Sequence, residues 1–214
     1  MITPRMGFIV YGVHKDGLKD PMGNPFIDEQ VIIQSKQVLV DRGIELVEYP
    51  VVIATKEEAK LALKKMRDDE KVDGVILFSG TWVWAANLIA AIRDFGMSGK
   101  GICIWTHPGS QGWRPVGGLV LHGALMEVGI THKFVYGLAD ELHEIDKIIS
   151  FSQACHLKNR LNQATIGAFG GRGMGQTVGV ADPSQWMKTF GLDIDSRDTT
   201  ELIRTAEEIT PDQL

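Results

Sequence analysis

Runs of consecutive apolar residues alternate along most of the chain with segments in which apolar positions recur every three or four residues. The runs predict strands over Arg5–Val13, Glu45–Val52, Gly74–Phe78, Gly101–Thr106, Phe134–Gly137 and Thr165–Phe169. The periodic segments predict helices over Ile27–Arg42, Lys56–Glu70, Trp84–Phe95, Leu119–Glu127 and Glu141–Asn162. Because the inner strands are apolar at nearly every position, they are typical of a parallel sheet that is buried on both faces.

The order of these elements predicts an α/β fold with a doubly wound parallel sheet of five strands. We expect the flavodoxin-like strand order 2-1-3-4-5, in which the first and third strands flank the point where the order reverses. Ligands of such sheets bind beyond the carboxyl ends of the strands at that point. A capping box is predicted at Thr55–Glu58, and Gly43 and Gly96 are expected to end two helices in the left-handed conformation.

The sixth predicted strand is followed by a glycine-rich turn and then by the segment Phe190–Leu202. In that segment Leu192–Asp195 alternates like a short strand, and Asp198 is placed as the cap of a helix. We interpret these residues as the start of a second α/β domain. The expected division is residues 1–162, an N-terminal α/β domain, and residues 163–214, the incomplete beginning of a second one.

The loops after the first, third and fourth strands contain the candidate binding residues. They are Tyr11 and His14 after the first strand, Trp82 after the third, and His107, Gln111 and Trp113 after the fourth. Sugars have C–H faces that pack on aromatic rings and hydroxyls that need donors and acceptors, so these residue types favour a carbohydrate site. Trp84 is expected in the core, whereas both the crevice and the core remain open for Trp82. For His107 the alternative is a hydrogen bond that orders its loop.

Composition excludes several classes of function. The net charge of −5 argues against broad contact with nucleic acid or with anionic membranes. The N-terminal apolar run is too short for a signal peptide or a membrane span, so a cytoplasmic location is expected. Cys103 and Cys155 are predicted to be buried free thiols.

The remaining candidate chemistry is weak. The run Gly170–Gly175 lacks the ending of a phosphate-binding P-loop, so nucleotide binding is a minor alternative. No residue spacing indicates a metal site or a nucleophile paired with a base. Four further histidines, at positions 122, 132, 143 and 156, are interpreted as structural.

Four features together resemble the L-fucose and L-arabinose isomerase-like family. They are the N-terminal β-α series, the Trp82 loop, the Gly-Arg-Gly-Met-Gly turn at Gly171–Gly175, and the segment Phe190–Leu202. The resemblance covers nearly all of this chain but only the first part of a family member. It implies a metal-dependent aldose–ketose isomerase that acts through a cis-enediol, with Mn²⁺ held by two carboxylates and a histidine. Those groups would lie beyond Leu214, so we expect no catalytic residue or metal ligand in this chain, which alone should be inactive.

The resemblance also implies that residues 1–162 are a substrate-recognition domain, and it implies roles for two residues of this chain. Trp82 would reach the sugar of a neighbouring subunit, so a homo-oligomer is expected, and Met174 would line the pocket. Arg172, beside it, can bind a hydroxyl or an anion on chemical grounds. The fucose branch has an arginine just after the glycine of the first strand, where this chain reads Gly7–Tyr11, so the sugar is left unassigned. The alternatives are a stand-alone module that binds a sugar or sugar phosphate without catalysis, and an interaction or scaffold protein.

Overall fold

The computed structural model describes residues 3–13, 27–108, 113–162, 164–171, 182–210 and 212. The chain divides into two compact units, Met1–His156 and Leu157–Leu214. The predicted domain boundary after residue 162 stays a prediction.

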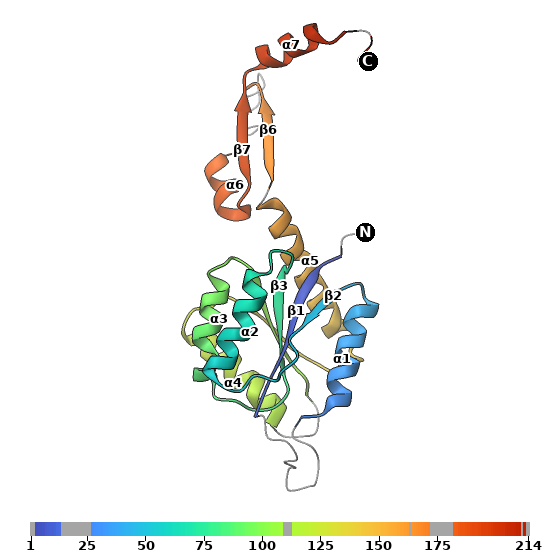
Figure 1. Cartoon of the computed structure of the whole chain (residues 1–214), viewed down its shortest axis with the longest axis vertical. Helices are drawn as coiled ribbons and strands as arrows, with labels where there is room; N and C mark the ends of the chain where they lie inside the picture. Colours follow the sequence, from blue (N-terminus) through green and yellow to red (C-terminus); the bar gives the residue numbers. More distant parts are fainter. Residues whose placement is uncertain are drawn as a thin grey trace. The chain divides into compact units, whose positions relative to one another are not determined.

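The first unit is built on a parallel sheet of five strands (Figure 1). The strands are β1 (Arg5–Tyr11), β2 (Glu45–Glu48), β3 (Gly74–Ser79), β4 (Gly101–Thr106) and β5 (Lys133–Tyr136). Their order is β2-β1-β3-β4-β5, which confirms the predicted doubly wound α/β fold and places the reversal between β1 and β3. Strands β1 and β2 end before the predicted Val13 and Val52, because apolar residues continue into the connections that follow them.

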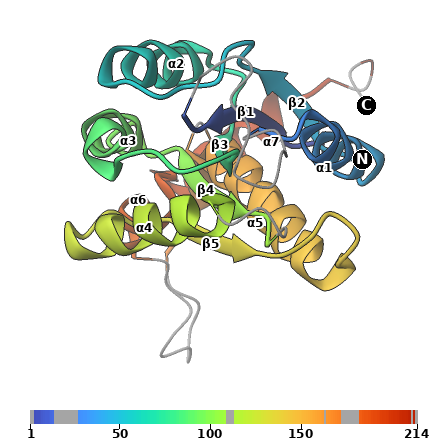
Figure 2. The same cartoon turned by 90° about the horizontal axis from the view of Figure 1, so that it is seen from below.

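Helices cover both faces of this sheet (Figure 2). One face is covered by α2 (Lys56–Asp68), the short 3₁₀ helix η1 (Ala85–Asn87), α3 (Ile89–Gly96) and α4 (Trp113–Glu127). The other is covered by α1 (Glu29–Asp41) and α5 (Leu142–Leu161). The sheet is therefore buried on both faces, as its continuous apolar strands indicated.

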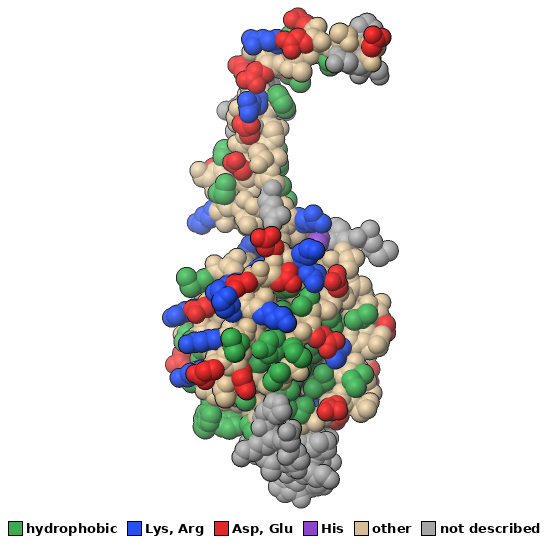
Figure 3. Space-filling model, in the orientation of Figure 1, with side chains coloured by type: hydrophobic (Ala, Val, Ile, Leu, Met, Phe, Trp, Pro, Cys, Tyr) green, Lys and Arg blue, Asp and Glu red, His purple; other side chains and the backbone are tan. Residues whose placement is uncertain are grey.

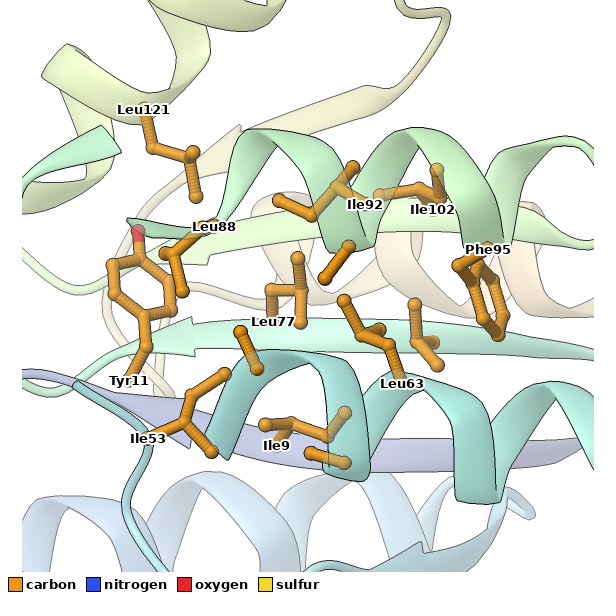
Figure 4. Packing of buried hydrophobic residues seen from close by; sticks show 14 of the residues in the cluster. Ile9, Tyr11, Ile53, Leu63, Leu77, Leu88, Ile92, Phe95, Ile102 and Leu121 are labelled. Carbon is orange, nitrogen blue, oxygen red and sulfur yellow. The ribbon is translucent and has the colours of Figure 1, made fainter. Parts of the chain in front are cut away.

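Alternate strand residues supply the two cores. Ile9 and Leu77 belong to the cluster beneath α2, α3 and α4, part of which is shown in Figure 4. Trp105 belongs to the cluster beneath α1 and α5, where its ring nitrogen donates to the carbonyl oxygen of Gly137 at 3.0 Å. Cys103 and Cys155 lie in the same cluster, and both are buried and form no disulfide bond, as predicted.

Local signals account for most helix ends. The predicted capping box is present, since Thr55 accepts from the Glu58 amide and Glu58 accepts from the Thr55 amide. Gly43 has a φ of 87°, so its predicted left-handed conformation is confirmed. The same prediction for Gly96 is wrong, because α3 runs through Gly96 and the left-handed glycine is Gly99, with a φ of 80°.

Two of the predicted helix starts differ most from the structure. Helix α4 begins at Trp113 rather than Leu119, because Pro115 fits the first turn of a helix, where its missing N–H costs nothing. Trp84 precedes the 3₁₀ helix η1 and is 66% exposed, so its expected core position is wrong. The buried residues of this segment are its smaller neighbours Val83 and Ala85.

Besides the end of α5, the described residues of the second unit contain two parallel strands and two helices. They are β6 (Thr165–Phe169), α6 (Pro183–Phe190), β7 (Asp193–Arg197) and α7 (Thr199–Glu208). Asp198 caps α7 by accepting from the Thr200 amide at 2.7 Å, as predicted. Nine large apolar side chains among the described residues of this unit are exposed: Leu157, Ile166, Phe169, Trp186, Met187, Phe190, Leu202, Ile203 and Ile209.

Candidate functional site

Three polar residues form a row at the carboxyl edge of the sheet. The strand register pairs Tyr11 of β1 with Ser79 of β3, and Ser79 with Thr106 of β4. Each lies two positions after a strand residue of the cluster beneath α2, α3 and α4, so the row faces those helices. All three residues are fully buried. The row therefore lies beside the point where the strand order reverses.

Helix α4 packs directly on this row because two of its residues lack side chains. A Cβ atom on Gly118 would overlap Oγ1 of Thr106, and one on Gly117 would overlap the carbonyl oxygen of Thr81. The Ser79 hydroxyl donates to the carbonyl oxygen of Arg114 at 2.8 Å. The first turns of α4 are thereby held on the ends of β3 and β4, and Arg114 is held with them.

The connections after β1 and β3 are bonded to each other. The amides of Gly80 and Thr81 donate to the carbonyl oxygen of Tyr11, at 2.9 and 3.4 Å. The amide of Val13 donates to Oγ1 of Thr81 at 2.6 Å. A Cβ atom on Gly12 would lie only 2.5 Å from that oxygen, so the close approach requires glycine. These bonds fix the backbone on both sides of the reversal point.

Arg114 is the most unusual residue at this edge, because its charge is buried and only partly compensated. The side chain is 3% exposed, and its Nη2 lies 3.7 Å from Oδ2 of Asp28. Nε and Nη1 have no hydrogen-bond partner among the described residues. Burial lowers the pKa of Arg114, and the nearby Asp28 carboxylate offsets part of this effect. The donors of a buried guanidinium are normally all hydrogen-bonded, so Nε and Nη1 of Arg114 can still donate to a ligand.

Asp28 has two functions, one at each of its oxygens. Oδ1 accepts from the amides of Gln30 and Val31, at 3.1 and 3.3 Å, and so caps α1. Oδ2 faces Arg114, while about a third of the side chain is exposed. The ion pair therefore joins the first turns of α1 and α4 at the carboxyl edge of the sheet.

His107 follows β4 directly and is 8% exposed. Its Nδ1 has no hydrogen-bond partner among the described residues. Burial lowers the pKa of His107, and the positive charge of Arg114 lowers it further, while Asp140 and Asp28 offset part of the change. The ring is therefore neutral at pH 7 and can donate through one nitrogen and accept through the other.

Two hydroxyls complete the cluster. The Tyr11 hydroxyl and Oγ1 of Thr106 are buried and have no partner with hydrogen-bond geometry among the described residues. Burial raises the pKa of Tyr11, which the neighbouring Ser79 lowers in part, so the phenol stays protonated. Figure 4 shows Tyr11 beside Ile53 and Leu88, at the carboxyl end of β1.

We define the carboxyl-edge site as Tyr11, Thr106, His107 and Arg114. Within the described parts of the chain, six buried side-chain polar atoms have no hydrogen-bond partner, and five of them belong to these four residues. The sixth is Oγ of Ser35, on α1. Since buried polar atoms in native proteins are nearly always paired, this concentration marks a place where a ligand can supply the missing partners.

An aromatic pair follows β3. Trp82 is half-buried and Trp84 is exposed, and their ring centroids lie 4.3 Å apart with the planes at 65°. Both follow Thr81, whose backbone is bonded to the end of β1. The pair places apolar ring surface in the connection next to the carboxyl-edge site.

The structure covers only part of the predicted binding set. Tyr11 and His107 belong to the carboxyl-edge site, and Trp82 lies in the adjoining connection. Trp113 begins α4, but the structure does not describe its side chain. Four other predicted residues lie outside the described residues: His14, Gln111, Arg172 and Met174. The prediction missed Thr106, Arg114 and Asp28. The Arg-Pro pair at 114–115 was a usable signal, since proline favours the first turn of a helix.

Other polar clusters in the described residues have structural explanations. His122 and His132 are bonded to each other at 2.8 Å, and His122 stacks on Phe134 with centroids 4.2 Å apart. His156 is bonded to Asp73 at 2.8 Å, which ties α5 to the residue before β3. No group of three His, Cys, Asp or Glu side chains within the described residues could hold a metal ion.

Two open clefts lie away from the carboxyl edge. One, of about 290 Å³, lies between α2 and α3 and is lined by Lys60, Leu63, Lys64, Arg67, Ala91, Asp94 and Phe95. The other, of about 420 Å³, is lined by Lys133, His143, Asp146, Lys147, Ser150 and Phe151. Lys and Arg side chains gather on the surface over α2 in Figure 3. Exposed charges of this kind are satisfied by water and by neighbouring charges, such as the Lys64–Asp68 pair, so neither cleft indicates a specific ligand.

Comparison with known proteins adds no assignment. No protein-family model matches the sequence, and no curated protein sequence matches it either. No helix among the described residues is long and apolar enough to cross a membrane. The resemblance to the sugar isomerases therefore stays a prediction from the residues quoted for it.

Proposed function

We propose that the first unit binds a sugar at the carboxyl-edge site. The observation that supports this most directly is the set of five buried polar atoms without partners, beside the reversal between β1 and β3. Ligands of doubly wound sheets bind beyond the carboxyl ends of the strands at that position. The proposed ligand is a pentose or hexose, with or without a charged substituent.

The chemistry of the four residues suits a polyhydroxylated molecule. Arg114 only donates, the hydroxyls of Tyr11 and Thr106 both donate and accept, and neutral His107 does the same through its two nitrogens. A buried polar group without a partner costs about 1–3 kcal/mol, so a ligand that pairs these groups gains binding free energy from each. The exposed ring of Trp84 and the half-buried Trp82 can cover a C–H face of the sugar.

We further propose that this binding unit is the recognition part of an aldose–ketose isomerase. The basis is the resemblance of the sequence, and the manganese ligands and the proton-transfer carboxylate would lie outside this chain. The role of the described residues is then to bind and orient the sugar. The exposed apolar side chains of the second unit favour this reading, because a two-stranded parallel sheet needs further elements to bury its faces.

The second candidate is a stand-alone module that binds a sugar without converting it. It is favoured by the position of the carboxyl-edge site, whose four residues all belong to the first unit. The two candidates share the ligand and differ in turnover. Incubation of the protein with manganese and each sugar that it binds, followed by detection of ketose, separates them.

Calorimetric titration of the chain with neutral pentoses and hexoses tests the proposal. We expect binding by one or more of them, weakened about tenfold or more by Thr106→Val, which keeps the shape and removes the hydroxyl. Trp82→Ala should weaken it also, by loss of ring contact. Trp186→Ala, in the second unit, is the matched control and should leave affinity unchanged. If no neutral or substituted sugar binds to the wild-type chain, the proposal is wrong.

A further inference from the structure

We infer that Arg114 binds an oxyanion, a phosphate, sulfonate or carboxylate group that is carried by the ligand. The inference rests on the proposed function only in assigning that group to a sugar. Its basis is the buried guanidinium, which is 3% exposed and has two nitrogens without partners among the described residues. Of all the side chains in the carboxyl-edge site, this one carries a permanent charge.

Asp28 compensates the charge of Arg114 incompletely. Its nearest oxygen is 3.7 Å from Nη2, which is beyond normal hydrogen-bond length, and its other oxygen is engaged by the amides that it caps. About a third of the Asp28 side chain is exposed, so water weakens its attraction for the guanidinium. The surroundings of Arg114 therefore favour the binding of a second negative group. The oxygens of that group would accept hydrogen bonds from Nε or Nη1 of Arg114.

The neighbouring groups suit the same ligand. Neutral His107 can donate one hydrogen bond to an anion without adding a fixed charge, and the hydroxyls of Thr106 and Tyr11 can donate one each. Helix α4, which carries Arg114 in its first turn, directs the positive end of its dipole toward this edge. Because Arg114 is buried, the residues that cover it must move apart for the anion to enter. The bound anion would then be shielded from water, and its attraction to the guanidinium is stronger in that environment than in water.

Inorganic phosphate is the probe for a test on the full chain at constant ionic strength, with chloride as the reference anion. We expect phosphate to bind and a phosphorylated sugar to bind more tightly than the neutral sugar. Arg114→Gln should weaken phosphate binding about tenfold or more, through loss of a charge-assisted hydrogen bond. Far-ultraviolet circular dichroism and the unfolding midpoint show whether that variant is folded.

Asp28→Asn provides a second test that does not depend on the stability of the arginine variant. Asparagine keeps the oxygen that caps α1, so the fold should persist, while the negative charge beside Arg114 is removed. We expect phosphate affinity to rise by about tenfold, because repulsion of the anion by the carboxylate is gone. Asp94→Asn makes the same change in net charge at an exposed position of α3 and should leave affinity unchanged.

The outcomes separate this inference from the proposed function. Binding of phosphate that is strengthened by Asp28→Asn upholds the inference. If a neutral sugar binds but phosphate binds to neither the wild-type chain nor Asp28→Asn, the inference is overturned and the proposed function stands. If phosphate binds and no sugar does, the oxyanion site stands and the proposed function falls. Equal effects of Asp28→Asn and Asp94→Asn would indicate a general effect of charge and would overturn the inference.

Discussion

Substitution of Gly118 by alanine tests whether close packing of α4 on the strand ends builds the carboxyl-edge site. A Cβ atom at this position would overlap Oγ1 of Thr106 and would lie 2.6 and 2.7 Å from its Cβ and Cγ2 atoms. Thr106 is short, branched and fully buried, so it cannot turn away into solvent. The helix must therefore move outward, and Arg114 must move with it.

Gly123 is the matched control, since it lies in the same helix and a Cβ atom there would have no atom within 4 Å apart from those of the adjoining helix backbone. Alanine in place of glycine within a helix stabilises by about 1 kcal/mol, and this gain is common to both variants. Overpacking of a core costs about 1–3 kcal/mol, and this cost falls on Gly118→Ala alone. The difference in unfolding free energy between the two variants should therefore be about 1–3 kcal/mol, with Gly123→Ala more stable than the wild-type chain.

Urea unfolding followed by circular dichroism measures both free energies. Thr106→Ala, which removes Oγ1 and Cγ2 but leaves Cβ, should recover part of the loss when combined with Gly118→Ala. Phosphate affinity should fall in Gly118→Ala and stay unchanged in Gly123→Ala. Equal stability of the two single variants would refute the argument that glycine at 118 is required by contact with Thr106.

Three further predictions concern local features. Thr55→Ala should destabilise the protein by about 1 kcal/mol, because it removes the hydroxyl half of the capping box, while Thr55→Ser should be nearly neutral in the same urea titration. Gly43→Ala should cost about 1–2 kcal/mol, because a residue with a Cβ atom must adopt a φ of 87° there; a neutral result would contradict this account of the helix end. Because the pKa of His107 is lowered in the folded chain, the unfolded chain binds a proton at a higher pH than the folded chain does. The free energy of unfolding should therefore fall as the pH is lowered through about 6.5. Urea titrations at pH 7.5 and 5.5 should show a smaller fall in the free energy of unfolding for His107→Gln than for the wild-type chain. An equal fall in the two proteins would argue against a lowered pKa of His107.

The architecture of the first unit could be predicted because its signals are local and repeated. Strands β3 and β4 are apolar at nearly every position, which fits only a strand covered on both faces. The capping box of α2 needs two residues three positions apart, and both are present in the sequence. Such features depend on neighbours in the chain, so a single sequence contains the information.

Two of the errors concern α4 and Trp84. The predicted start of α4 was too late because Gly117 and Gly118 have low intrinsic helix propensity, whereas in the structure they let the helix pack closely on the ends of β3 and β4. For α4, a tertiary contact outweighed local preference. Trp84 was placed in the core as the first residue of a predicted amphipathic helix, but the structure buries its smaller neighbours Val83 and Ala85 instead.

The sequence by itself determined the α/β series, the order of strands and helices, and the edge of the sheet at which the candidate residues lie. It did so because apolar periodicity and the handedness of β-α units act over short stretches of chain. Only the tertiary structure decided which polar atoms remain unpaired at that edge. Tyr11, Thr106 and Arg114 come from different elements, and whether a buried group has a partner depends on atoms that are distant in sequence, which no local pattern specifies.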